Sequence, residues 1–364
     1  MSRSAQSEPF VRIVKRDGVA PAKNLLIHFV ALLGALVMGG VIVLCMGHNP
    51  FAVYAEMVTG SIGSPSVLKD TIRIAIPLLI TAIAIAIAFR MRFWNIGGEG
   101  QILVGAIAAS YFALFYADSM PSAMLLVVMA VAGMLGGGLC GMLPAVFKAK
   151  WNTNETLFTL MLNYIALEFI KYLQNGPWKD PKQRGFPKVA MFADAARLPK
   201  VLGVHAGWII ALLLVVLAAV YLRKSKHGFE IAVVGESTAT ARYAGINVGR
   251  VLVRTMFISG ALCGLVGFLQ VSGANFTLSS AAAGGVGFTA ITVAWLAKLN
   301  PFVMTPVAFF IAMLERGGNK IQTTFGVPSS VSSLLTGIIL FFMLGCEFFI
   351  NYRLVFRSGK EARQ

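Results

Sequence analysis

Long apolar runs alternate with short polar stretches along almost the whole chain. The runs cover about 25–46, 71–89, 101–117, 122–147, 156–173, 207–222, 254–272, 286–299, 302–315 and 330–350. A helix needs roughly 20 apolar residues to cross the hydrocarbon of a bilayer, and fewer where protein shields it. The pattern predicts an all-α, polytopic transmembrane helical bundle with about ten spans. The runs 286–299 and 302–315 are short, and Lys298, Asn300 and Pro301 between them indicate a turn at the membrane edge.

Composition makes lipid the solvent of this bundle. The 364 residues are 57% hydrophobic and only 13% charged, which is about half the charged fraction of soluble domains. We expect one domain over 25–350, flanked by basic tails at 1–24 and 351–364. The formal charge is +16. The cations lie between the apolar runs and in the tails, which argues against a nucleic-acid-binding face.

Cysteines and histidines suggest no chemistry of their own. Cys45, Cys140, Cys263 and Cys346 lie in or beside apolar runs without CxxC spacing, so we expect free thiols. The histidines are scattered, and no metal-ligand cluster is expected. The first apolar run is too long for a signal-peptide core, so we expect it to be a retained helix.

Lysine and arginine set the expected orientation. With the N-terminus inside, most of the 31 cations fall on the cytoplasmic side, as the positive-inside bias requires. Ten spans then return the C-terminus to the cytoplasm as well. The loop 174–206 would lie outside although it carries six cations: Lys179, Lys182, Arg184, Lys188, Arg197 and Lys200.

Two apolar helices lead into glycine-rich polar breaks at matching places. The run 71–89 is followed by NIGGEGQ at 95–101, and the run 254–272 by SGAN at 272–275 and AGGVG at 283–287. The first run points inward and the second outward. This predicts two inverted-topology repeats, about 25–173 and 207–350, with broken helices around a transport path. Glycines at every fourth position indicate close helix packing: Gly133, Gly137 and Gly141, and again Gly260 and Gly264.

Polar residues within the spans are candidates for the substrate pathway. They are Asn95, Glu99, Gln101, Asn163, Tyr164 and Gln270, with Phe93 and Trp94 able to stack on a ring. The alternative is that Glu99 and Asn163 hold the broken helices together, because broken backbone needs such bonds in any case. For Glu168 and Glu347, near helix ends, the structural interpretation is favoured.

The loop 223–254 is the longest hydrophilic connection expected on the cytoplasmic side. Ser237 can cap a short helix over 238–244, and Gly245 stands where a helix C′ glycine belongs. Arg242 and Tyr243 give this helix a charged and an aromatic handle for a groove on another protein. The alternative is a surface turn without a partner.

Four segments together resemble one known family. They read FWNIGGEGQ at 93–101, NETLFTLMLNY at 154–164, ARYAGIN at 241–247 and GFTAI with AWL at 287–296. These segments resemble motifs of ABC-transporter permeases that import branched-chain amino acids, simple sugars or nucleosides. The motifs occur in the same order as in that family, and the resemblance covers about residues 70–350. The subgroup with these motifs is usually assigned to nucleoside or simple-sugar uptake. One departure is Glu236-Ser237-Thr238, where the family often has Asn-Pro before its coupling helix.

The resemblance implies partners as well as a fold of about ten helices. These are a second permease subunit, homologous or identical, two cytoplasmic ATPases and a periplasmic or lipid-anchored solute-binding protein. It also implies a bacterial inner-membrane location. The chain has no G-x-x-x-x-G-K-[ST], so ATP and Mg would be used by the partner ATPase and no cofactor by this chain. The coupling residues would be Ser237, Thr238, Ala241, Arg242, Tyr243 and Gly245.

The basic outer loop gains a role from this resemblance. Lys182, Arg184 and Lys188 would meet acidic residues of the binding protein, because complementary charge speeds and orients encounter. The resemblance favours a nucleoside as the solute, and a simple sugar or branched-chain amino acid is the alternative. An ion-coupled secondary transporter would also show inverted repeats. A membrane-embedded enzyme is disfavoured, since no constellation of nucleophile and base is found.

Overall fold

The computed structural model describes residues 11–15, 21–182 and 185–356. Within this part of the chain there are thirteen α-helices. Four strands form two short two-stranded sheets. The chain divides into two compact units. Unit 1 comprises Met1–Met57 and Gly317–Gln364, and unit 2 comprises Val58–Arg316.

Unit 1 is built on a pair of antiparallel helices. Its elements are β1 (Val11–Lys15), α1 (Pro21–Cys45), the start of α2 (Pro50–Ile62), the end of α12 (Pro301–Phe325), α13 (Ser329–Asn351) and β4 (Tyr352–Phe356). The strand before α1 pairs antiparallel with the strand after α13, and Val14 faces Arg353 in the register. The sheet therefore places the start of α1 beside the end of α13. His28 Nε2 lies 3.9 Å from Glu347 Oε1, consistent with a structural carboxylate.

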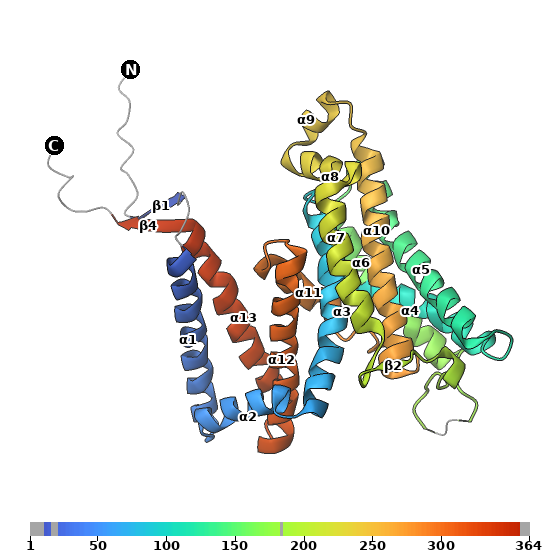
Figure 1. Cartoon of the computed structure of the whole chain (residues 1–364), viewed down its shortest axis with the longest axis horizontal. Helices are drawn as coiled ribbons and strands as arrows, with labels where there is room; N and C mark the ends of the chain where they lie inside the picture. Colours follow the sequence, from blue (N-terminus) through green and yellow to red (C-terminus); the bar gives the residue numbers. More distant parts are fainter. Residues whose placement is uncertain (1–10, 16–20, 183–184, 357–364) are drawn as a thin grey trace. The chain divides into compact units, whose positions relative to one another are not determined.

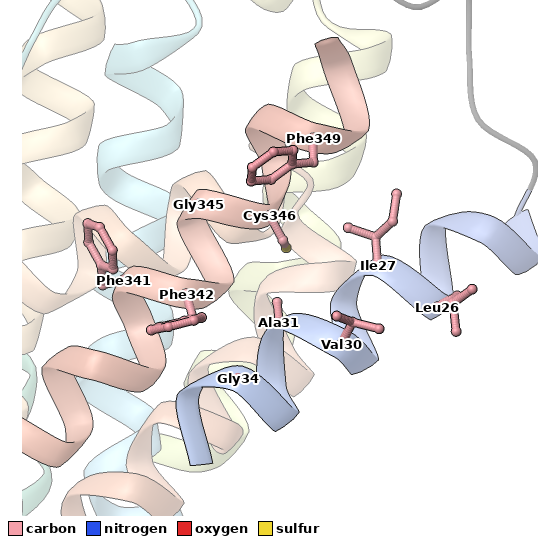
Figure 2. A pocket seen from close by; sticks show the side chains of 10 residues that line it. All are labelled: Leu26, Ile27, Val30, Ala31, Gly34, Phe341, Phe342, Gly345, Cys346 and Phe349. Carbon is pink, nitrogen blue, oxygen red and sulfur yellow. The ribbon is translucent and has the colours of Figure 1, made fainter. Parts of the chain in front are cut away.

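A groove of about 640 Å³ lies between α1 and α13 (Figure 2). Its lining is wholly apolar: Leu26, Ile27, Val30, Ala31, Gly34, Phe341, Phe342, Gly345, Cys346 and Phe349. A polar solute would lose its hydrogen bonds with water there and gain none in return. The groove is therefore not a candidate for the solute site.

Unit 2 holds the remaining helices. They are α3 (Pro65–Phe89), α4 (Gly98–Phe115), α5 (Ser122–Trp151), α6 (Glu155–Asn175), α7 (Gly207–Lys224), α8 (Lys226–Glu236), α9 (Thr238–Tyr243), α10 (Val248–Leu269) and α11 (Val286–Leu296). Unit 2 also contains a turn of 3₁₀ helix, η1 (Asp194–Ala196), a hairpin of β2 (Lys200–Val201) and β3 (Val204–His205), and a π-helical turn, η2 (Gln270–Asn275). The end of α2 and the start of α12 belong to it as well. Polar caps begin several of these helices. Ser64 caps α3, Asn154 caps α6, and Asn247 caps α10.

Glycines bring three helices of unit 2 into backbone contact. A Cβ on Gly264 of α10 would lie 2.0 Å from the carbonyl oxygen of Gly133 of α5. A Cβ on Gly105 of α4 would lie 2.4 Å from the Cα of Gly264. The predicted glycine stripes are therefore packing surfaces, as small residues in membrane helices usually are. Helix α3 completes this core, and its residues 76–89 are all buried.

Eight helices of the described residues are long and apolar enough to cross a membrane. They coincide with eight of the ten predicted runs: α1, α3, α4, α5, α6, α7, α10 and α13. The other two runs differ. The run 286–299 forms only the 11 residues of α11, about 16 Å of helix, which is too short to span alone. The run 302–315 extends into the 25-residue α12, whose second half carries Glu315, Arg316, Asn319, Lys320 and Gln322.

Candidate functional site

Helices α3 and α10 run antiparallel in unit 2, and each is followed by a break in regular structure. Arg73, near the start of α3, donates to the carbonyl of Ala274 beyond the end of α10. Ser259, in the middle of α10, donates to the carbonyl of Ala84 near the end of α3 at 2.7 Å. We call residues 90–97, after α3, the first break, and residues 270–285, after α10, the second break.

The two breaks lead into helices whose N-termini meet. Glu99, in the first turn of α4, accepts hydrogen bonds from the backbone N–H groups of Gly285 and Gly287, each at 2.8 Å. A Cβ on Gly287 would lie 2.2 Å from Glu99 N, so the backbones of α4 and α11 touch there. We call this contact, Gly98–Gly100 against Gly285–Gly287, the junction. The positive N-terminal ends of both helices face the carboxylate of Glu99, which stabilises their partial charges.

The junction lies within the length of α3 and not at its end. Gly98 lies next to the side chains of Thr81 and Ile85, one to two turns before the end of α3 at Phe89. The first break therefore turns back along α3 before α4 begins. Gly285, with φ +82°, lets the chain turn sharply into α11, a conformation that glycine adopts without steric cost.

Asn95 and Gln101 are buried and bonded to one another. Gln101 Nε2 donates to Asn95 Oδ1 at 3.0 Å, and Asn95 Nδ2 lies 3.3 Å from Ser259 Oγ. Asn95 Oδ1 also accepts from the N–H of Gly97. These amides thus fix the first break against α10, and their polar atoms are used within the protein.

Helix α6 holds the other side of the first break. Asn163 accepts from the N–H of Gly100 at 2.8 Å and donates to the carbonyl of Ile96 at 3.0 Å. Thr159, one turn earlier, accepts from the N–H of Ile96 at 3.3 Å. Broken backbone in a helical layer needs such partners, because an unsatisfied polar group is costly there. Asn163 therefore has the bonding role that was weighed against contact with solute.

The remaining pathway candidates divide by exposure. Phe93 is buried, Gln270 begins η2 and is half-buried, and Tyr164 is 59% exposed on α6. Trp94 stacks on Trp295 of α11, with ring centroids 5.8 Å apart and an interplanar angle of 22°. Both indoles are 43% exposed. They form an open aromatic surface at the end of α11 farther from the junction.

Sequence reasoning missed several residues of this site. Thr159 could have been found, because it stands four residues before Asn163 on the same face of a helix. Trp295 stood in a recognised segment without a role. No sequence signal marked Ser259, since a lone serine in an apolar run is common in membrane helices. Glu168, expected to be structural, pairs with Lys171 on the surface of α6 at 2.6 Å.

The predicted short helix over 238–244 is present as α9. Ser237 accepts from the N–H of Thr240 at 3.2 Å, and Gly245 has φ +78° after the helix. Ala241 is buried beneath the helix, whereas Thr238 and Arg242 are exposed and Tyr243 is 96% exposed. Helices α8 and α9 lie at one end of unit 2, and β2 lies at the other (Figure 1).

The base of α9 borders a groove of about 410 Å³ with the end of α5. Lys148, Asn152, Thr238, Arg242 and Asn247 line it together with apolar residues. Lys148 Nζ also pairs with Glu155 Oε2 at 2.9 Å, which joins the end of α5 to the start of α6. This end of unit 2 thus carries an exposed helix beside a partly basic groove.

Lys182 and Lys188 of the loop 174–206 are exposed, and Arg184 lies outside the described residues. No group of three His, Cys, Asp or Glu residues that could hold a metal ion occurs in the part of the chain that the structure covers.

The model of the family described as "Branched-chain amino acid transport system / permease component" matches residues 67–344. The chain belongs to this family. It is the permease component of an ABC importer for a small solute, a multi-pass membrane protein that is not itself the catalytic subunit. Membership implies ATPase and solute-binding-protein partners. The match includes both breaks, the junction and α9.

Three curated relatives resemble this permease over most of its length. The glucose ABC transporter permease protein TsgB13 of Haloferax volcanii is 32% identical over 91% of this chain and 90% of its own. The guanosine ABC transporter permease protein NupP of Bacillus subtilis is 30% identical over 93% of this chain and 96% of its own. The nucleoside ABC transporter permease protein NupB of Lactococcus lactis is 29% identical over 88% and 91%. Relatives at similar identity thus divide between sugar and nucleoside transport.

Proposed function

We propose that this permease translocates a nucleoside along a path that passes the junction between α4 and α11. The observation that carries the proposal is the bidentate contact of Glu99 with Gly285 and Gly287. Half-helices whose N-termini meet inside the helical layer are typical of transporters, where the discontinuity lies at the solute path. Such backbone is tolerated only when protein or a water-filled cavity surrounds it.

We propose that the two halves of the permease, about 25–173 and 207–350, are related by inverted topology. The antiparallel course of α3 and α10 supports this, as does a break followed by a helix after each. Rocking of one half against the other would then open the path alternately to the two sides. Such rocking would act at the junction, where the carboxylate of Glu99 and a backbone contact join the two halves.

The nucleoside assignment is supported by the guanosine and nucleoside permeases among the relatives, and the exposed pair Trp94 and Trp295 offers a surface for its base. An indole face can stack on a planar base, and base–aromatic stacking contributes roughly 1–3 kcal/mol per base. The second candidate solute is a sugar such as glucose, which the relative TsgB13 favours. Tryptophan faces also pack against the C–H groups of sugar rings, so the aromatic pair serves either solute.

In the proposed assembly the end of unit 2 that carries α9 faces the cytoplasm of a bacterium, and both termini lie on that side. Arg242 and Tyr243 of α9 dock into a groove of an ATPase, which uses ATP and Mg while this chain binds no cofactor. A second permease subunit, homologous or identical, faces this one. The opposite end receives the solute-binding protein, and the exposed Lys182 and Lys188, with Arg184, attract its acidic residues.

Uptake by the reconstituted importer tests the function. The permease is placed in proteoliposomes with its second permease subunit and its ATPase, and its binding protein is added outside. Labelled guanosine, adenosine, glucose and ribose are compared with and without internal ATP. We expect ATP-dependent uptake of the two nucleosides. Uptake of glucose with no uptake of either nucleoside would move the assignment to the sugar, and uptake without ATP would contradict an ABC importer.

A further inference from the structure

Residues 187–205, which we call the strap, lie against the first part of the second break. Phe192 N donates to the carbonyl of Phe276 at 2.8 Å, and Leu198 N donates to the carbonyl of Ser272 at 3.0 Å. Two side chains of the break bond back to the strap. Ser272 Oγ donates to the carbonyl of Ala196 at 2.5 Å, and Thr277 Oγ1 donates to the carbonyl of Val189 at 3.0 Å.

The second break depends on these bonds because its own helical ladder is interrupted. Helix α10 ends in the π-helical turn η2, and Phe276 then adopts φ +56°. The last carbonyls of a helix have no partners within it and must find them elsewhere. Here those of Ser272 and Phe276 are bonded by the strap, and that of Ala274 by Arg73. π-Helical turns occur frequently at functional sites.

The strap has a buried face and an exposed face. Phe192, Ala196 and His205 are buried within unit 2. The guanidinium of Arg197 lies 5.3 Å from the centre of the Phe276 ring. Arg197 also donates two hydrogen bonds to the carbonyl of Phe192. Its side chain therefore contacts both the strap, at Phe192, and the second break, at Phe276. Other strap residues are exposed: the cations Lys188 and Lys200, the large apolar Met191 and Leu202, and the carboxylate of Asp194, which pairs with Arg197 at 2.7 Å.

Chain continuity connects the strap to the junction. Seven residues lie between Thr277 and Gly285, the first residue whose N–H is held by Glu99. A displacement of the strap that carries Ser272 and Thr277 with it therefore reaches the start of α11 through a short segment.

We propose that the strap and residues 272–277 move as one element, which transmits the docking of an acidic partner protein on the exposed face of the strap to the junction. The inference rests on the proposed function, which places this end of the permease outside the cell. Ser272 and Thr277 are positioning residues that act through the break. Lysines around large apolar side chains fit a protein surface with apolar anchors and an acidic rim.

A reversible covalent bridge tests this mechanism. In a permease whose four native cysteines are replaced by alanine, Ser272→Ala is combined with Val189→Cys and Thr277→Cys. These changes remove both side-chain bonds from the break to the strap, and a short bifunctional thiosulfonate reagent then bridges the cysteines until a reductant releases it. The control lacks the four native cysteines in the same way and keeps Ser272 and Thr277. All variants are assembled with the importer's ATPase, second permease and binding protein.

We expect the unbridged variant to lose at least five-fold in maximal uptake of guanosine or glucose, whichever the unaltered importer transports. The concentration of binding protein at half-maximal uptake should stay within two-fold, because the docking face is intact. Bridging should restore uptake, and reduction should abolish it again. Equal uptake before and after bridging would overturn the proposal, and so would a bridge that blocks transport.

Hydrogen–deuterium exchange of the purified full-length permease gives a readout that needs no transport. Bridging should slow exchange of residues 270–285 in the variant, and unchanged exchange would contradict the proposal. An unaltered importer that transports no solute would count against the proposed function. A transporting importer with a bridge-insensitive variant would count against the strap alone.

Discussion

Glu99 and Gly287 join the two broken regions of the permease through one hydrogen bond and one backbone contact. Glu99 Oε2 accepts from Gly287 N at 2.8 Å, and the space where Gly287 would carry a Cβ is filled by the backbone of Glu99. The contact needs a carboxylate on one helix and a missing side chain on the other. Both requirements can be tested separately.

Replacement of Glu99 should weaken the junction according to how many N–H groups lose an acceptor. Hydrogen bonds to charged groups contribute about 1.5–3 kcal/mol each. In Glu99→Gln one oxygen remains for Gly285 or Gly287, and the amide N–H₂ faces the other N–H. In Glu99→Ala both N–H groups lose their acceptor. We expect the thermal midpoint of the detergent-purified permease to fall in the order wild type, Gln, Ala. Equal midpoints for all three would contradict the junction.

Two glycines in the same contact should differ in their tolerance of alanine. A Cβ on Gly287 would lie 2.2 Å from Glu99 N, whereas the nearest atom to a Cβ on Gly98 is the Cα of Gly287 at 3.6 Å, an ordinary contact. Overpacking costs about 1–3 kcal/mol, or more when backbone must move. Gly287→Ala should therefore lower both yield of folded protein and uptake, and Gly98→Ala should leave both near wild type. Size-exclusion profiles and uptake assays measure the two. Equal tolerance would mean that the helices are farther apart.

The fold was largely predictable from the sequence because membrane-spanning helices can be recognised by their length and apolar composition. Eight spans followed from that rule. The rule was least secure at 286–299, a run already noted as short, where the helix α11 begins at the junction and is only 11 residues long. Hydropathy measures the apolar length of a segment, and it cannot show that Glu99, far away in sequence, bonds the N-terminus of α11.

The motifs of the candidate site could be found in the sequence, but the hydrogen-bond partners of its residues could not. Asn95, Gln101 and Asn163 were expected on the pathway because buried polar side chains in membranes are usually functional. Whether such an amide faces solute or backbone depends on packing, and here all three have backbone or side-chain partners. The strap could not be predicted, since all of its bonds to the break involve backbone groups of the strap, which every residue type carries.

Acid should destabilise the permease through His205. Burial, together with the positive charge of Arg73, lowers the pKa of His205 to about 4, and its Nε2 has no hydrogen-bond partner among the described residues. The unfolded chain binds the proton near pH 6.5. The contribution of neutral His205 to the free energy of unfolding is therefore present above about pH 6.5 and is lost as the pH drops toward 4. The loss is roughly 2 kcal/mol at pH 5.

Thermal unfolding of the solubilised permease between pH 7.5 and pH 5 measures the effect of His205. The control is His205→Asn, whose side-chain oxygen can still accept from Gly207 N, as His205 Nδ1 does at 3.3 Å, but cannot titrate. The decrease in midpoint on acidification should be smaller in this variant. An identical decrease in both proteins would assign the acid sensitivity to other groups.

Helix α9 should link transport to ATP hydrolysis. Arg242→Glu with Tyr243→Ala removes the exposed cation and aromatic ring without touching the buried Ala241. We expect normal insertion and assembly, but binding protein should no longer stimulate ATPase activity and uptake should fall at least ten-fold. The matched control is Lys224→Glu, which reverses an exposed charge at the end of α7. Normal uptake by the double variant would remove α9 from the coupling interface.

Passage of solute beside the junction is tested most directly by the reactivity of a cysteine at Phe288, which follows Gly287 and is 45% exposed. Phe288→Cys is placed in the permease without native cysteines, and Ile165→Cys on the exposed face of α6 is the control. A membrane-impermeant maleimide is applied to the assembled importer with and without ATP and transported solute. We predict that the labelling rate at 288 changes several-fold with nucleotide state and falls when solute is present, while labelling at 165 responds to neither. A labelling rate at 288 that is the same in every condition would contradict a path past the junction.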